Sequence, residues 1–265
     1  MPGGLYKGDP LKPRERAELE VDLISLCDRE LDLLGDIRGL DVLYAGGSSV
    51  LWIEGLSQRI GEGGSLATLD ADAARLGEAR ELLGEAGLAS PVRLFAGNVF
   101  EPPFGPRTFD LVYSAGLFHE LDVRERTAED ALAALVTATR PGGLVSTSDF
   151  ISSAPALQLE DEEIEAELAR EASGAELYGI GPPERLVALH ERLLSAVRWL
   201  VWPPYVLRHL DRLIVAESEP GELTHLPAGA QKRLRRRREA LLQGVRREGY
   251  TRPATLYVEG LAAGG

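Results

Sequence analysis

The chain has 265 residues, of which 44% are hydrophobic and 27% charged, a balance typical of a globular protein rather than a disordered one. Its formal net charge of −13 repels polyanions and so argues against a nucleic-acid partner. Cys27 is the single cysteine, which excludes an intrachain disulfide and a four-cysteine zinc site.

The N-terminal segment lacks the apolar stretch of a signal peptide, and no apolar run is long enough to cross a bilayer. We therefore expect a cytoplasmic protein without membrane association. Residues 1–12 are rich in Gly and Pro and predict a mobile arm. Leucines at helical spacing then predict a helix over 14–34, opened by Pro13 and ended by Gly35.

Strands and helices alternate from residue 40 to residue 150. The predicted strands are 40–44, 66–70, 91–95, 109–114 and 144–148. The helices predicted between them are 51–60, 73–83 and 127–140. This alternation predicts an α/β fold with a doubly wound, mostly parallel sheet, in which ligands bind at the carboxyl ends of the strands.

The alternation stops after residue 150. An acidic helix is predicted over 157–171 and another helix over 184–194. Two further strands, 197–202 and 212–216, are predicted to close the sheet edge as a hairpin. The last segment, 218–265, is predicted as an extension with a basic helix near 231–247 and a short strand over 255–258.

Short motifs punctuate the strand ends of the first half. A strand runs into the turn Ala45-Gly46-Gly47-Ser48-Ser49, and Asp70 ends the next strand. The pair Gly97-Asn98 follows the third strand. The fourth carries the sequence FDLVYSAGLFHEL over 109–121, and a Pro-Gly-Gly turn at 141–143 precedes the fifth. The order and spacing of these motifs resemble the class I S-adenosylmethionine-dependent methyltransferases, and within them the small-molecule, menaquinone-biosynthesis type.

The resemblance covers less than half of the chain and implies a seven-stranded, Rossmann-like sheet. It implies S-adenosylmethionine as cofactor, S-adenosylhomocysteine as its product and methyl transfer as the reaction. The cofactor-binding residues that it implies are Tyr44, Ala45, Gly46, Gly47, Ser48, Asp70, Ala71, Asn98, Val99, Ser114 and Ala115.

Two positions of the first motif depart from the family pattern. Tyr44 stands where the family usually has Asp or Glu, and Ser48 stands at the second glycine. At the other motifs the resemblance implies that Asp70 accepts the ribose hydroxyls. It also implies that Asn98 offers an amide oxygen to the adenine amino group.

The resemblance places His119 beside the acceptor as a candidate catalytic base, and a histidine packed at a helix start is the alternative. The four histidines are scattered and predict no metal site. Trp199, Trp202 and Tyr205 form an aromatic cluster that is either core or the lining of an acceptor pocket.

The predicted organisation has an N-terminal arm and lid helix over 1–39 and a methyltransferase-like domain over 40–217. That domain contains an acceptor-side helical insertion over 151–195, and the extension over 218–265 follows it. The predicted acceptor is a small molecule, and a homodimer is compatible with the sequence.

Two alternatives stay open. Tyr44 and Ser48 suggest a non-catalytic relative that binds or assembles, in which the Tyr44 ring fills the methionine pocket. Seven residues, KRLRRRR at 232–238, suggest a nucleic-acid methyltransferase. However, no aromatic residues interleave with these arginines to stack bases, and pairing with the acidic helix is a simpler explanation.

Overall fold

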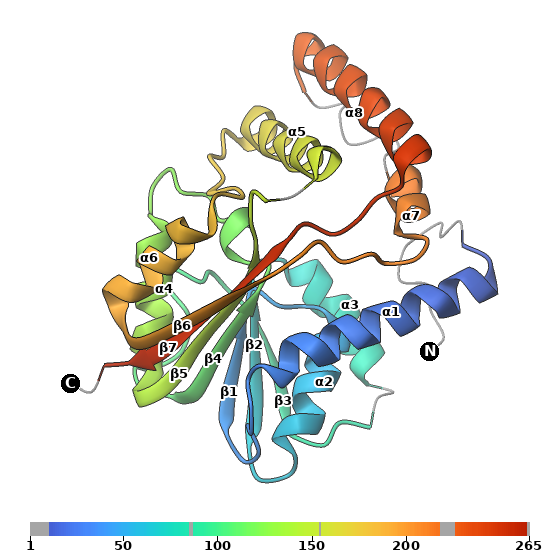
Figure 1. Cartoon of the computed structure of the whole chain (residues 1–265). Helices are drawn as coiled ribbons and strands as arrows, with labels where there is room; N and C mark the ends of the chain where they lie inside the picture. The colour runs from blue at the N-terminus through green and yellow to red at the C-terminus, as the bar shows by residue number, and fades with distance from the viewer. Residues whose placement is uncertain (1–10, 85–86, 154, 218–225, 264–265) are drawn as a thin grey trace.

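Seven strands form one mixed sheet, in the order β3-β2-β1-β4-β5-β7-β6 (Figure 1). The computed structural model describes residues 11–84, 87–153, 155–217 and 226–263. The strands are β1 (Asp41–Ala45), β2 (Ser65–Asp70), β3 (Val92–Ala96), β4 (Phe109–Ala115), β5 (Thr139–Phe150), β6 (Leu194–Trp202) and β7 (Thr255–Ala262). β1 to β5 pair in parallel, and β7 runs antiparallel to both β5 and β6. The predicted doubly wound, mostly parallel, seven-stranded sheet is confirmed.

Helices cover both faces of this sheet. The helices of the described ranges are α1 (Pro13–Asp32), α2 (Val50–Ile60), α3 (Ala73–Leu83), α4 (Ala128–Ala138), α5 (Ala156–Ser173), α6 (Pro183–Leu193), α7 (Leu210–Glu217) and α8 (Ala228–Glu248). A single 3₁₀ turn, η1 (Phe118–Glu120), follows β4. α1, α2 and α3 contribute to the core on one face, whereas α4 and α6 contribute to the core on the other.

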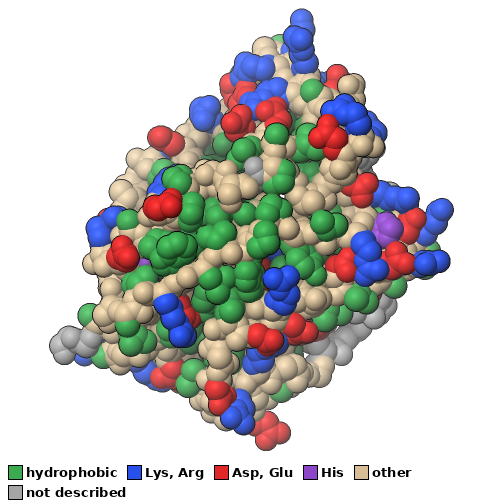
Figure 2. Space-filling view, in the orientation of Figure 1, with side chains coloured by type: hydrophobic (Ala, Val, Ile, Leu, Met, Phe, Trp, Pro, Cys, Tyr) green, Lys and Arg blue, Asp and Glu red, His purple; other side chains and the backbone are tan. Residues whose placement is uncertain are grey.

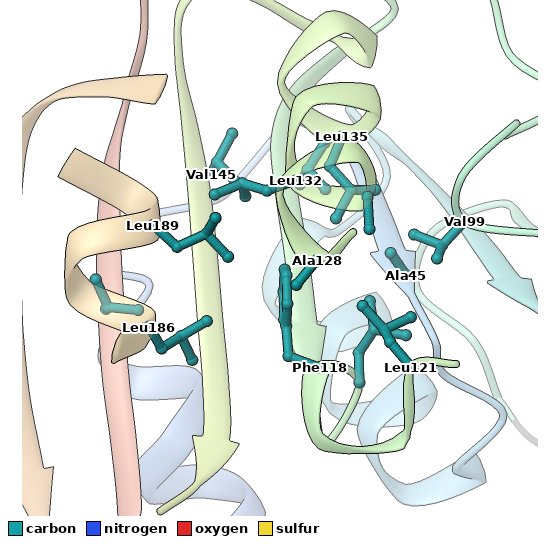
Figure 3. Close-up of a cluster of buried hydrophobic side chains, with 14 of the residues drawn as sticks. Ala45, Val99, Phe118, Leu121, Ala128, Leu132, Leu135, Val145, Leu186 and Leu189 are labelled. Atoms are coloured by element: carbon teal, nitrogen blue, oxygen red, sulfur yellow. The ribbon is translucent and has the colours of Figure 1, made fainter. Parts of the chain in front are cut away.

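Alternate residues of β1 enter these two cores. Val42 and Tyr44 pack among the side chains of α1 and α2, while Leu43 and Ala45 pack on the α4 side. A strand that is buried on both faces reads as a continuous apolar run, and this is why β1 could be recognised in the sequence. Figure 3 shows the α4 side, where Leu132 and Leu135 of α4 and Leu186 and Leu189 of α6 point toward the sheet.

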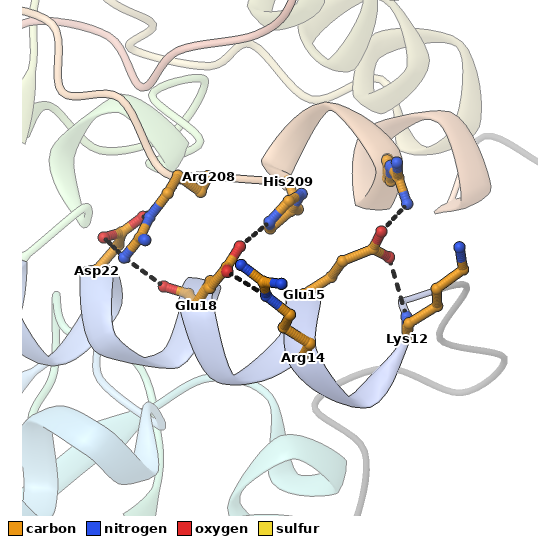
Figure 4. Close-up of polar contacts among 8 residues, drawn as sticks. Lys12, Arg14, Glu15, Glu18, Asp22, Arg208 and His209 are labelled. Atoms are coloured by element: carbon orange, nitrogen blue, oxygen red, sulfur yellow. Dashed lines mark hydrogen bonds and ion pairs between the residues drawn. The ribbon is translucent and has the colours of Figure 1, made fainter.

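The predicted strand over 212–216 is wrong, because this segment lies in α7. Leu213 and Leu207 are buried against Leu19 and Leu26 of α1. Polar contacts join the same two segments: Asp22 pairs with Arg208, and Glu18 contacts His209 (Figure 4). Glu15 also pairs with Arg212. A short apolar run fits a helix as well as a strand, and the contacts with α1 decide in favour of the helix.

The predicted hairpin of 197–202 with 212–216 is therefore also wrong. β7 is the partner of β6, and it lies between β5 and β6 in the sheet. The predicted C-terminal extension, 218–265, thus supplies a strand of the same sheet. The chain also changes from helix to strand earlier than predicted near 140, because α4 ends at Ala138 and β5 begins at Thr139.

The predicted insertion over 151–195 divides between two places. α6 packs on the sheet, whereas α5 packs against α8 through an apolar cluster that includes Ile164, Leu234 and Val245. Acidic and basic side chains are intermingled at the top of the molecule, where α5 and α8 lie (Figure 2). Arg237 contacts Glu160, Glu163 and Glu167 of α5. Pairing of the basic helix with the acidic helix of the same chain is therefore observed.

Gly64 allows the chain to enter β2 close beside the start of β1. A Cβ atom at this position would clash with the carbonyl oxygen of Leu40 and lie 2.7 Å from a methyl carbon of Ile60. Because backbone cannot move aside cheaply, we expect Gly64→Ala to lower the free energy of unfolding by about 1–3 kcal/mol. Chemical denaturation measures this change.

Gly77 provides the matched control. It lies within α3, and a Cβ atom there meets nothing within 4 Å. Gly77→Ala should raise the free energy of unfolding by up to about 1 kcal/mol, because alanine is the better helix former. Equal effects of the two substitutions would contradict the assignment of Gly64 as a packing constraint.

Candidate functional site

A cavity of about 750 Å³ opens at the carboxyl ends of the parallel strands. Its size suits a small organic ligand. Nine of the predicted site residues line it: Tyr44, Gly46, Ser48, Asp70, Ala71, Asn98, Val99, Ala115 and His119. The other three, Ala45, Gly47 and Ser114, are buried and do not line it. The Ser114 hydroxyl donates instead to the hydroxyl of Thr147 at 3.2 Å.

The turn after β1 depends on two glycines. Gly46 has a φ of +71°, which is strained for other residues, and a Cβ atom there would lie 2.6 Å from Leu117 Cδ1. A Cβ atom on Gly47 would clash with the ring of Tyr44. The amide groups of Gly46 and Gly47 both donate to the carbonyl oxygen of Leu69, at 2.7 and 3.2 Å. The turn is thereby held against the end of β2.

Tyr44 takes the place of the acid that the family pattern would have. Its ring is buried, stacks on Tyr113 at 5.6 Å between ring centroids, and belongs to the core beneath α1 and α2. Burial raises the pKa of the Tyr44 phenol, so it stays neutral. Gly47 supplies the space that this ring needs. The Tyr44 ring therefore packs in the core and borders the cavity without filling it.

Asp70 lies at the end of β2 with one carboxylate oxygen engaged. Its Oδ1 accepts from the amide of Asp72 at 2.8 Å, and Asp72 caps α3 by accepting from the amides of Ala74 and Arg75. Among the residues that the structure describes, Oδ2 of Asp70 has no hydrogen-bond partner. The turn thus fixes the carboxylate and leaves one oxygen for a ligand.

Asn98 is exposed at the end of the cavity near β3. Its Oδ1 accepts from the amide of Phe100 at 3.0 Å. The amide oxygen that the sequence suggested for adenine therefore already holds the local turn. Its remaining lone pair and the side-chain NH₂ group are what Asn98 can offer a ligand.

His119 is held by a residue that the sequence analysis missed. Its Nδ1 lies 2.6 Å from Oδ1 of Asp149, whose Oδ2 accepts from the amide of Phe118 at 2.6 Å. Asp149 is buried at the end of β5. The signal was a carboxylate directly after the predicted strand 144–148, at the same rim as Asp70. With Nδ1 engaged, only Nε2 of His119 is available toward the cavity.

The charge of Asp149 sets the protonation of His119. Burial by itself lowers the pKa of His119, but the charge and hydrogen bond of Asp149 outweigh it and raise this pKa to about 9. Two acids add to the effect: Glu120, whose Oε1 lies 3.8 Å from Nε2, and Glu162 of α5. Burial in turn raises the pKa of Glu162. The imidazole is therefore protonated at neutral pH.

The aromatic cluster of the C-terminal half lies apart from this cavity. Trp199 is 51% exposed on β6, and the guanidinium of Arg29 lies over the rings of Trp202 and Tyr205. None of the three aromatic residues lines the cavity. Phe150 and Leu117 line the cavity instead. The sequence placed both near strand ends but did not show that their side chains face the cavity.

Within the described ranges, no group of three or more His, Cys, Asp or Glu side chains is placed to hold a metal ion. No helix in this part of the chain is long and apolar enough to span a bilayer.

Comparison with known sequences identifies relatives of the first half. Residues 42–143 match the family described as "Methyltransferase domain". A stretch of 122 residues is 32% identical to the ubiquinone/menaquinone biosynthesis C-methyltransferase UbiE of Idiomarina loihiensis. This match covers 45% of the chain and 46% of that relative, so the chain spans about half of the relative's length.

Solved structures share the fold over nearly the whole chain. A putative sarcosine dimethylglycine methyltransferase from Galdieria sulphuraria aligns with a TM-score of 0.56 and 18% identity, over 97% of this chain and 91% of that one. A geranyl diphosphate methyltransferase in complex with S-adenosylmethionine aligns with a TM-score of 0.57 and 17% identity, over 97% and 93%. At these identities the likeness concerns the fold.

The pairing of His119 with Asp149 predicts a pH dependence. Because the folded-state pKa of about 9 lies above the ordinary value of 6.5, the proton on His119 stabilises the fold fully below pH 6.5. This stabilisation is lost as the pH rises through about 9. In Asp149→Asn the imidazole stays buried without its counter-charge, and we expect its pKa to fall below 6.5. NMR titration of the imidazole signals measures the change.

Glu120→Gln is the control, because Glu120 is exposed and more distant from the ring than Asp149. It should lower the pKa of His119 only slightly. The free energy of unfolding of the wild type should fall by roughly 1–3 kcal/mol more than that of Asp149→Asn between pH 6.5 and 9. An unchanged His119 pKa in Asp149→Asn would show that Asp149 does not control the proton.

Proposed function

We propose that this chain transfers the methyl group of S-adenosylmethionine to a small-molecule acceptor bound beside His119. Residues 42–143 match the family described as "Methyltransferase domain", and a stretch of 122 residues is 32% identical to a C-methyltransferase, which supports this proposal. The observation that carries the proposal is the cavity of about 750 Å³ at the strand ends. It brings together the glycine turn, Asp70, Asn98 and His119, which come from four separate segments.

The residues present fit the cofactor. The available oxygen of Asp70 can accept the ribose hydroxyls, and the exposed side chain of Asn98 can meet the adenine. The turn at Gly46 lies between the ends of β2 and β4, where the sulfur-bearing part of the molecule would lie. When bound, S-adenosylmethionine supplies a methyl group on a sulfonium, which is already a strong electrophile.

The protein's own contribution is then to position the reactants and exclude water. His119 is the one side chain on this cavity for which we propose a proton-handling role. Asp149 orients its ring, and Nε2 can hold or release a proton at the acceptor. With a pKa of about 9, the imidazole is a strong base whose neutral form becomes abundant only at alkaline pH.

The non-catalytic alternative is less well supported than methyl transfer. The Tyr44 ring is stacked within the core on Tyr113, and a cavity of about 750 Å³ remains beside it. The altered first motif therefore does not close the site. Nucleic-acid methylation is also not favoured, because Arg233, Arg237 and Arg238 of the basic helix are paired with acids of α5.

Calorimetric titration with S-adenosylhomocysteine tests the proposal. We expect micromolar binding to the wild type. Asp70→Ala should weaken it by roughly tenfold or more, because a charged hydrogen-bond acceptor is lost. Asp72→Asn is the control: it keeps an N-cap for α3 and should bind almost as the wild type does. A folded protein that binds neither S-adenosylmethionine nor S-adenosylhomocysteine would overturn the enzyme assignment.

A further inference from the structure

A second cavity, of about 180 Å³, adjoins the first on the other side of the β1 turn from Asp70. Both cavities are lined by Tyr44, Ser49, Ala115, Gly116 and Phe150. The second is completed by Glu30, Trp52, Ser148, Arg252 and Thr255. It therefore lies where β1, β4 and β5 end and β7 begins, next to α1 and α2. A ligand that extends past the glycine turn, away from Asp70, would enter it.

A buried acid and a base meet in this second cavity. Glu30 is 1% exposed, and its Oε1 lies 3.4 Å from Nη1 of Arg252. The indole N–H of Trp52 donates to Oε2 of Glu30 at 3.2 Å, and the Tyr113 hydroxyl donates to the same oxygen at 3.4 Å. These contacts are long for a buried carboxylate, which is expensive to leave weakly paired.

The carboxylate of Glu30 has too little positive charge around it. Burial raises the pKa of Glu30, and the lowering effects of Arg252, Trp52 and Tyr113 do not cancel that rise. The guanidinium of Arg252 lies over the ring of Phe150, 4.9 Å from the ring centroid. The backbone amide of Arg252 donates a hydrogen bond to the carbonyl oxygen of Tyr205. Within the described segments, Nε and Nη2 of Arg252 have no hydrogen-bond partner.

Building on the proposed function, we propose that Glu30 and Arg252 bind the amino-acid end of S-adenosylmethionine. That end is a zwitterion: its ammonium group matches the Glu30 carboxylate, and its carboxylate matches the guanidinium of Arg252. If this end lies against both side chains, the four charged groups alternate in sign around a ring and are joined by charge-assisted hydrogen bonds. The cofactor would then lie along the rim from Asn98 to Glu30.

This assignment explains how the chain manages without an acid at position 44. Tyr44 fills the space between Gly47 and Tyr113, and Tyr113 contacts Glu30. A carboxylate therefore lies on the same side of the sheet, but it comes from α1 rather than from β1. The larger first cavity, with His119 and Glu120, is left for adenosine and the acceptor.

The test compares two ligands that differ only at this end. 5′-Methylthioadenosine lacks the amino-acid group that S-adenosylhomocysteine carries. Calorimetry should show that Glu30→Gln and Arg252→Lys each lower the affinity for S-adenosylhomocysteine by roughly tenfold to a hundredfold. The affinity for 5′-methylthioadenosine should stay within about twofold, because the adenosine subsite is untouched. Glu20→Gln, the same chemical change elsewhere on α1, should alter neither affinity.

The fluorescence of Trp52 gives an independent readout. Since its indole bonds to Glu30, S-adenosylhomocysteine should change the emission and 5′-methylthioadenosine should not. A Trp52→Phe variant shows which part of the emission comes from Trp52, because only Trp199 and Trp202 remain in it. Thermal melting shows whether each variant is folded, and Arg252→Lys keeps the positive charge beside Glu30 while removing the planar guanidinium.

Three outcomes separate the possibilities. Parallel losses for both ligands in Glu30→Gln would mean a general disturbance and overturn the assignment. Unchanged affinity for both ligands in Glu30→Gln and Arg252→Lys would show that the two side chains do not bind the cofactor and would also overturn the assignment. If the wild type binds neither ligand, the proposed function itself fails, which is a different result from a failure of this inference.

Discussion

The burial of β1 on both faces is the constraint on which the site depends. β1 lies between β2 and β4 in parallel pairing, so the three strands end at one rim. The chain must turn sharply there, and the amides of Gly46 and Gly47 bond to the end of β2. Parallel pairing thus places the glycine turn, Asp70 and the segment after β4 side by side without any direct attraction among them.

The packing beneath the turn is coupled to the residue at position 44. A tyrosine there requires a neighbour without a side chain at position 47, because the ring occupies that volume. In return the ring stacks on Tyr113 and extends the core under α1 and α2. The tyrosine at position 44 therefore places no charge beside the cavity, and Gly47 leaves the room that its ring needs.

The two ends of the chain complete the rim. α1 supplies Glu30, and the segment leading into β7 supplies Arg252, so residues far apart in sequence meet beside the cavity. α1 is itself held by ion pairs with Arg208 and Arg212 and by a hydrogen bond between Glu18 and His209. The ordering of α1 is for this reason coupled to the C-terminal half, and a change in either could reach the site.

Local sequence was sufficient where the chemistry is local. The apolar run of β1, the turn at 45–49 and the acid after β2 predicted the parallel sheet and most of the cavity lining, because strand ends on one rim follow from alternation alone. The sequence could not determine whether 212–216 was helix or strand, since a short apolar run suits both until Leu213 meets α1.

Tertiary structure alone decided the partners of the charged groups. It placed Asp149 on His119 and directed the Ser114 hydroxyl to Thr147. It also inserted β7 between β5 and β6. Such pairings join segments that are 30 to more than 200 residues apart, as His119 with Asp149 and Glu30 with Arg252 show. The sequence fixes which side chains carry charge, but only the packed sheet determines which of them meet.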